Sequence, residues 1–286
     1  MAQAMGAEVP LTAGRDLPVN TLWNAWTEVS GTRTTDERYG LSNRNTQGNL
    51  TLGLDRQITP DIVAGFSLGA QNNHGSGYHG NLRTDSDGVV LGPYAALRLS
   101  PAWAADASFS YTRLSSDAEI SVLSGSATVQ SYATTLGLSG QYVVNEWFIR
   151  PKLSVSYTVN DSDTRNMRGI LAGVPIAITL PGGNSDYGLA EAYTEFSRLY
   201  ALSNGLYLIP YLELGVHYEY KRANDGRIQT GDFSYATPSG WYGSVRTGVR
   251  AQLSNNVLLE GGVGYLSLGQ NGRDVWEGKV RVSVGF

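Results

Sequence analysis

The sequence lacks several features that would point to common classes of protein. It has no cysteine, which fits a compartment where stray disulfides would be a hazard. No run of about 18 or more apolar residues is present, so the sequence contains no transmembrane helix. Charged residues make up only 16% of the chain and the net charge is -4, so nothing suggests a nucleic-acid partner.

Targeting and catalytic motifs are also missing. The first residues have neither the basic start nor the apolar stretch of a signal peptide, so we expect the part before about Asn20 to be an added start or a piece cut from a longer precursor. The chain has no HExxH, no GxSxG and no phosphate-binding loop. We therefore expect no enzyme, no catalytic residue, no cofactor and no metal site.

Glycine and aromatic residues are abundant instead, with 35 Gly, 17 Tyr and 6 Trp. This composition suits β-strands and the aromatic bands of membrane barrels. The mean hydropathy of -0.20 is that of a soluble protein. Strands with one apolar and one polar face average out in such a score, so the hydropathy does not exclude a barrel.

The last thirteen residues, Asp274–Phe286, alternate between two faces. Trp276, Val280 and Phe286 are among the residues that share an apolar face, and Lys279 and Arg281 are among those on the polar face. This is the period of a β-strand with two different sides. The strand resembles the terminal strand of outer-membrane barrels, which their assembly machinery recognises. The assembly signal that this resemblance implies consists of Val280, Val282, Val284 and Phe286.

Five short segments rich in turn-forming residues divide the chain, and their spacing leaves room for two strands and one longer connection each. They occupy residues 58–61, 99–102, 143–146, 202–205 and 253–256. Five tight turns imply ten strands, and one more strand lies at each end. The sequence predicts an all-β fold, a transmembrane antiparallel up-and-down barrel of twelve strands. Residues 21–286 form this barrel, and residues 1–20 form a linker that leads into its lumen.

The predicted strands have one apolar and one polar face throughout. Leu50, Leu52 and Leu54 alternate with Asn49 and Thr51, for example. Twelve strands enclose more space than side chains can fill, and the polar faces carry charges in mid-strand, so the polar side suits a watery lumen and the apolar side suits lipid. The residues predicted to line the lumen are Glu28, Arg98, Lys152, Glu213, His217, Arg246, Arg250 and Glu260.

Aromatic residues recur at matched positions on these strands. Trp103 and Trp147 follow tight turns, and Tyr111 and Tyr157 lie further along the same faces. At ~3.3 Å per residue and ~45° tilt, each interval crosses roughly 19–23 Å, close to the apolar thickness of an outer membrane. The predicted aromatic girdle comprises Trp103, Tyr111, Trp147, Tyr157, Tyr218, Trp241 and Tyr265.

The remaining connections are longer and polar, and we expect them to be extracellular loops, with the short turns and both termini periplasmic. One of them contains the apolar run Ile170–Leu180, which could fold into the lumen, extend a hairpin above the membrane or simply decorate the surface. The predicted loops span residues 33–45, 72–88, 113–128, 161–186, 221–239 and 269–274.

The strand count, the size, the terminal strand and the opening Leu22-Trp23-Asn24-Ala25-Trp26 are together similar to the translocator domain of autotransporters, the type V secretion pathway of Gram-negative bacteria. The resemblance covers about Asn20 to Phe286. It implies an outer-membrane barrel that passes an N-terminal passenger to the cell surface. The partners that it implies are the passenger, the barrel assembly machinery, outer-membrane lipid and lipopolysaccharide. It also implies that the barrel is a monomer.

The resemblance also leaves points of difference and alternatives. Family members often keep a helix in the lumen, whereas residues 1–20 contain glycines and prolines that disfavour one. Some members cleave the passenger by asparagine cyclisation with inward carboxylates, for which Glu28, Glu213 and Glu260 are candidates. A passive channel or porin for ions or small solutes shares the same architecture, and an outer-membrane enzyme is a further alternative.

Overall fold

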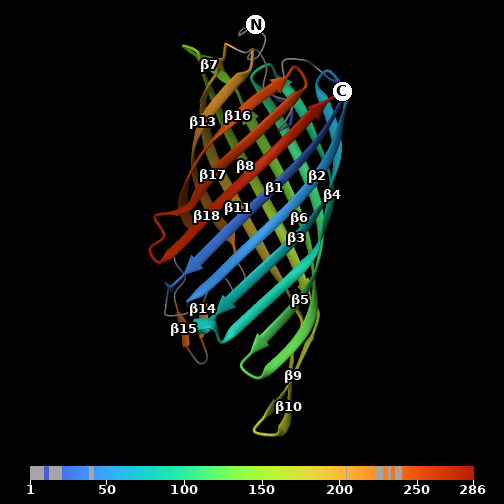
Figure 1. Ribbon diagram of the computed structural model, residues 1–286, viewed down its shortest axis with the longest axis vertical. Helices are drawn as coiled ribbons and strands as arrows, with labels where there is room; N and C mark the ends of the chain where they lie inside the picture. Colours follow the sequence, from blue (N-terminus) through green and yellow to red (C-terminus); the bar gives the residue numbers. More distant parts are fainter. Residues whose placement is uncertain are drawn as a thin grey trace.

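A computed structural model describes residues 10–12, 21–38, 42–203, 205–222, 228–230, 233–235 and 240–286. The chain folds into a closed antiparallel barrel of twelve strands (Figure 1). In chain order the barrel strands are β1 (Trp23–Asp36), β2 (Asn43–Thr59), β3 (Ile62–Gly77), β4 (Leu82–Ser100), β5 (Trp103–Ile120), β6 (Leu123–Gly140), β8 (Trp147–Ser162), β11 (Gly183–Arg198), β13 (Tyr207–Lys221), β16 (Trp241–Ser254), β17 (Val257–Leu268) and β18 (Arg273–Gly285).

Short elements extend this wall at its two rims. At one rim β7 (Tyr142–Val144) pairs with β8, and β12 (Tyr200–Ala201) pairs with β13. At the other rim lie the 3-10 turn η2 (Tyr78–Gly80), the hairpin of β9 (Arg165–Leu171) and β10 (Val174–Leu180), and the hairpin of β14 (Ile228–Thr230) and β15 (Phe233–Tyr235). In the part of the chain that the structure describes, no helix has the length and apolar character to span a bilayer.

The barrel closes where the first strand meets the last. β1 and β18 pair without a register shift from Asn24 opposite Gly285 to Asp36 opposite Arg273. Phe286 extends this seam, because its backbone N–H and C=O both bond to Trp23, at 2.9 and 2.8 Å. The two strands are therefore paired along the whole seam, as a bilayer requires of a spanning sheet.

Alternation decides which side of each strand faces out. Leu50, Leu52 and Leu54 are 45–52% exposed on the outer surface, and Trp276 and Val280 on β18 are exposed in the same way. The residues between them turn inward, where Asp55 and Val63 have no exposed surface at all. The prediction of an apolar outer face is therefore confirmed, as is the number of barrel strands.

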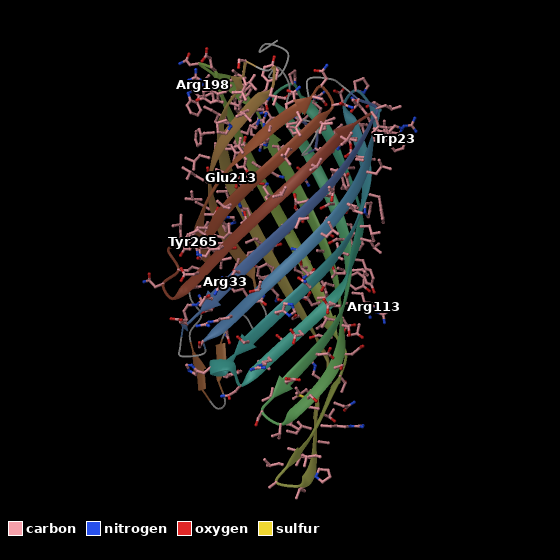
Figure 2. The ribbon with its side chains drawn as sticks, in the orientation of Figure 1. Trp23, Arg33, Arg113, Arg198, Glu213 and Tyr265 are labelled. Carbon is pink, nitrogen blue, oxygen red and sulfur yellow. The ribbon has the colours of Figure 1, made fainter. Side chains whose placement is uncertain are left out.

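The predicted tight turns are confirmed, and they all lie at one rim; residue 204, in the turn at 202–205, lies outside the described residues. The β7–β8 turn has Asn145 and Glu146 at φ of 49° and 71°, the left-handed pair that matches the twist of a two-residue hairpin. The C-terminus and Trp23 lie at the same rim (Figures 1 and 2).

Most of the predicted bounds of the long loops are wrong. Residues 72–77, 82–88, 113–120 and 123–128 continue the strands β3 to β6, so the β3–β4 and β5–β6 connections are only residues 78–81 and 121–122. The polar composition that indicated loops belongs to strands that continue past the apolar band. The run Ile170–Leu180 forms most of the β9–β10 hairpin, which extends furthest from the rim of short turns (Figure 1). Part of the predicted loop 221–239 lies outside the described residues.

Candidate functional site

One side of the lumen wall is lined by ion pairs between neighbouring strands. Near the rim of short turns, Arg250 on β16 makes a two-pronged ion pair with Glu195 on β11 and lies 3.5 Å from Glu260 on β17. Lys279 on β18 reaches Glu260 at 2.9 Å, and Arg150 on β8 lies 3.7 Å from Glu195. The carboxylates are 7–9% exposed, so each buried charge has an opposite partner within reach.

A second group of ion pairs lies further along the same strands. Arg246 bridges Glu213 on the neighbouring β13 at 2.7 Å and Glu277 on β18 at 2.5 Å. Arg281 on β18, which lies opposite Glu260 in the strand register, reaches Glu28 on β1 at 3.2 Å. We call the inward faces of β8, β11, β13, β16, β17, β18 and β1 the charged wall.

His217 occupies a buried hydrogen-bonded relay within the charged wall. Its Nδ1 lies 2.8 Å from Glu191 and its Nε2 lies 2.8 Å from the hydroxyl of Ser244, while its ring stacks on Tyr242 at 4.8 Å. The order of groups matches the nucleophile, base and orienting acid of a serine hydrolase. Ser244 is only 2% exposed, however, and a Cβ on Gly215 would touch its hydroxyl, so a substrate carbonyl has no room to approach. The relay therefore has a structural role: it links the side chains of β11, β13 and β16 across the wall.

The opposite side of the lumen, the inward faces of β2 to β6, is almost free of charge. Throughout these fully described strands, the inward charged residues are Asp55, Arg98 and Asp106. Asp55 is buried beneath Tyr94 and Asn24, and Asp106 lies 3.9 Å from Lys152 of the charged wall. The other inward side chains are mainly Gly, Ala, Ser, Thr, Asn and Gln. We call this side the neutral wall.

Large rings lie over several lumen glycines. The ring of Trp26 covers Gly53, and its Nε1 donates to the hydroxyl of Tyr94 at 2.8 Å. Tyr94 in turn covers Gly65, where an added Cβ would come within 2.5 Å of the ring. At these positions glycine makes space for aromatic side chains rather than for open lumen. The ring of Tyr211 likewise covers Gly248 and Gly262 in the charged wall.

The N-terminal segment contacts the neutral wall. Leu11, in neither helix nor strand, is 7% exposed and packs in one cluster with Val63, Ala96 and Ala104, on β3, β4 and β5. Pro10, Leu11 and Thr12 border a cavity of about 360 Å³ that is also lined from both walls. Its lining includes Ser108, Ser139, Lys152, Glu195, Arg250, Glu260 and Lys279.

The other predicted site residues lie at the rims or on the outer surface. Arg98 is at the rim of short turns, where it donates to the carbonyl of Pro60 at 3.2 Å. Trp147 is 44% and Tyr157 41% exposed on the outside of β8. Outer aromatics pair across strands, at ring distances of 4.5 to 5.3 Å. The pairs are Tyr111 with Tyr132, Tyr218 with Trp241, and Tyr265 with Trp276.

The residues predicted to form the assembly signal lie at the seam. Val280 and Phe286 are 52% and 62% exposed on the outer surface, and Val282 and Val284 share their face between them. Figure 2 shows Trp23 and Arg198 near the rim of short turns, and Arg33 and Tyr265 toward the opposite end of the wall. The sequence did not single out Glu195, Trp26 or Tyr94 as lumen-lining residues, although alternation places all three on inward faces.

Comparisons with known proteins agree with this architecture. A model of the autotransporter β-domain family matches residues 25–264, which is most of the chain. The chain belongs to the autotransporter β-domain family. It is therefore an outer-membrane translocator barrel. No relative among curated proteins matches it by sequence.

Solved structures of similar fold include three translocators. The translocator domain of the autotransporter NalP from Neisseria meningitidis has a TM-score of 0.71 at 16% identity, over 94% of this chain and 90% of that one. The β-domain of the Bordetella autotransporter BrkA has 0.71 at 19%, over 93% and 100%. The transport unit of AIDA-I from Escherichia coli has 0.60 at 17%, over 92% and 90%. At these identities the likeness concerns the fold.

The described residues offer no obvious metal centre. Among them, no group of three or more histidine or acidic side chains is placed to hold a metal ion. In the charged wall, acidic groups are instead paired with arginine, lysine or histidine, as Glu213, Glu195, Glu260 and Glu191 are.

Proposed function

We propose that the translocator barrel passes the polypeptide attached ahead of β1 through its own lumen to the cell surface. The observation that supports this proposal most directly is Leu11, which is packed inside the lumen although it precedes the first strand. The seam between β1 and β18 is paired along its length and offers no lateral exit. Residues 1–20 are, in this proposal, the linker between passenger and barrel.

We assign the rim of short turns to the periplasm and the rim of the β9–β10 hairpin to the cell exterior. Short turns face the periplasm in bacterial outer-membrane barrels. The start of the first barrel strand and the end of the last one then both lie on the periplasmic side. The barrel acts as a monomer, surrounded by phospholipid and lipopolysaccharide at its outer aromatics. Its terminal strand, with Phe286, is the part that the assembly machinery recognises.

The lumen-lining residues have a structural role in this proposal. Their charges form pairs within the wall, so the wall is polar but leaves few charges free to hold a passing chain. Glu28, Glu213 and Glu260 each contact a basic side chain, which favours this role over passenger cleavage. We assign the barrel no enzymatic activity of its own.

The test is a fusion that places a signal peptide and an epitope-tagged, unfolded passenger ahead of Leu22. The tag should become accessible to protease on intact cells, while a periplasmic marker stays protected. Heat-modifiable migration of the barrel in gels verifies its insertion. If the barrel inserts normally and the tag stays periplasmic, even behind a linker helix from a known autotransporter, the translocator proposal is wrong.

A passive channel is the second candidate, because it shares the polar wall and the closed barrel. It predicts a different result in the same experiment, since the barrel would insert and conduct small ions with no passenger exposed. The seating of Leu11 in the lumen favours the translocator, because a segment that fills the cavity would obstruct a channel.

A further inference from the structure

The lumen wall of the translocator has two unlike sides, and the N-terminal segment contacts one of them closely. Leu11 is buried against Val63, Ala96 and Ala104, which belong to three adjacent strands of the neutral wall. Seen from the lumen, these small side chains form a shallow apolar seat. The seat is next to the rim at which a chain entering from the short-turn side would begin its passage.

The neutral wall continues from this seat toward the opposite rim. Beyond Asp55 and Asp106 its inward positions on β3 and β5 are mostly small or polar and uncharged, such as Ser67, Gly69 and Ser110. On β4 the inward ring of Tyr94 lies over Gly65. Small side chains lose little conformational freedom when a chain slides over them. Their hydroxyl groups can also exchange hydrogen bonds with a passing backbone, as water does.

The charged wall presents the opposite situation to a passing chain. Its long side chains are fixed by partners on neighbouring strands, as Arg250 is by Glu195 and Arg246 by Glu213. A chain that pressed against them would have to separate buried ion pairs, and leaving one partner of such a pair uncompensated is strongly unfavourable.

We propose that the translocating polypeptide runs off-centre, along the neutral wall formed by β3, β4 and β5, and leaves the ion pairs of the charged wall intact. The occupant is the chain's own N-terminal polypeptide, in extended form, with Leu11 marking the start of its path. This proposal rests on the proposed translocator function and specifies which side of the lumen the passenger contacts.

The chain has no cysteine, so single cysteines can report this contact without background. Ser108→Cys places one thiol on the neutral wall, and Lys279→Cys places the matched thiol on the charged wall. Both positions line the same cavity as Pro10 and Leu11. Each barrel variant is combined with a second thiol, which is stepped through successive positions of a passenger segment. A folded domain on the N-terminal side of that segment stalls it in the lumen. Disulfides form only where the two Cβ atoms approach within about 4.5 Å.

We expect disulfide yields with Ser108→Cys to exceed those with Lys279→Cys several-fold over the stepped positions. Equal yields would mean that the passenger is centred, and a preference for Lys279→Cys would place it on the charged wall; either result overturns the proposal. Ser67→Cys and Lys152→Cys form a second pair, so one poorly folding variant does not decide the outcome. Lack of surface exposure of an unstalled passenger would instead reject the translocator function itself.

Discussion

On the charged wall, large side chains are held by partners on neighbouring strands, whereas the inward side chains of the neutral wall are mostly small and uncharged, apart from the ring of Tyr94. Arg250 has Glu195 and Glu260 around it, while Ser108 lines the same cavity with one hydroxyl. The same up-and-down meander builds both sides. The difference indicates that the two sides of one lumen can have different properties. Paired charges hold the side chains of one side in place, and the small side chains of the other side obstruct a passing chain little.

The largest expected effect is on the charged wall. Arg250→Met keeps much of the side-chain volume but leaves Glu195 without its two-pronged partner. Because both residues are largely buried, we expect a loss of about 3–5 kcal/mol in the free energy of unfolding, measured by urea titration in lipid vesicles. Ser108→Ala on the neutral wall is the control and should change it by less than about 0.5 kcal/mol. Equal losses would remove the energetic difference between the two walls.

A smaller effect is expected where an aromatic ring covers a glycine of the neutral wall. Gly53→Val places methyl groups where the ring of Trp26 lies, so the ring must shift. Overpacking of this kind costs about 1–3 kcal/mol of unfolding free energy. Gly31→Val is the matched control, because a Cβ there meets its nearest atom at 3.6 Å. If Gly53→Val is as stable as Gly31→Val, the ring does not depend on that space.

A third change alters lumen charge with little effect on stability. Lys152 is 33% exposed and lies 3.9 Å from Asp106, so Lys152→Gln removes a positive charge from a weak ion pair. We expect the reversal potential in planar bilayers to shift toward cation selectivity. Ser139→Gln, at the directly opposite position on β6, adds the same amide and should leave the potential unchanged. An unaltered potential for Lys152→Gln would mean that this side chain does not border the conducting path.

The smallest effect on stability is expected at the seam, outside both walls. Phe286→Ala keeps the two backbone bonds to Trp23 and removes a ring that is 62% exposed. The purified folded barrel should therefore unfold at nearly the same urea concentration. In cells, the folded, heat-modifiable form should decrease, because the change removes the ring from the proposed assembly signal. Normal levels in cells would place the assembly signal elsewhere.

The candidate site could be predicted from the sequence in part. Alternation on β13 and β16 indicated that Glu213, His217 and Arg246 lie on one face of their strands. The partners were not predictable, because Arg246 meets Glu277 from β18 only after the barrel closes. Nor was it predictable which lumen glycines leave open space, because a glycine's neighbour across the strands decides whether a ring such as Trp26 fills that space.

The ends of the strands show a similar limit. Residues 113–128 were predicted to be a loop because their polar composition does not fit a membrane. They pair as β5 and β6 almost to the turn at Ser121, since hydrogen bonds between adjacent strands form whether lipid or water surrounds them. Hydropathy therefore marked the limits of the apolar band and not the limits of the strands.

The sequence by itself determined the strand count, the outer face and the rim of the tight turns, because the two-residue period and the turn-forming residues are local properties of the chain. Only the tertiary structure decided that β1 pairs with β18, that charges gather on one side of the lumen, and that Leu11 rests on the other. These features depend on which strands become neighbours when the sheet closes, and closure joins residues that lie far apart in the sequence.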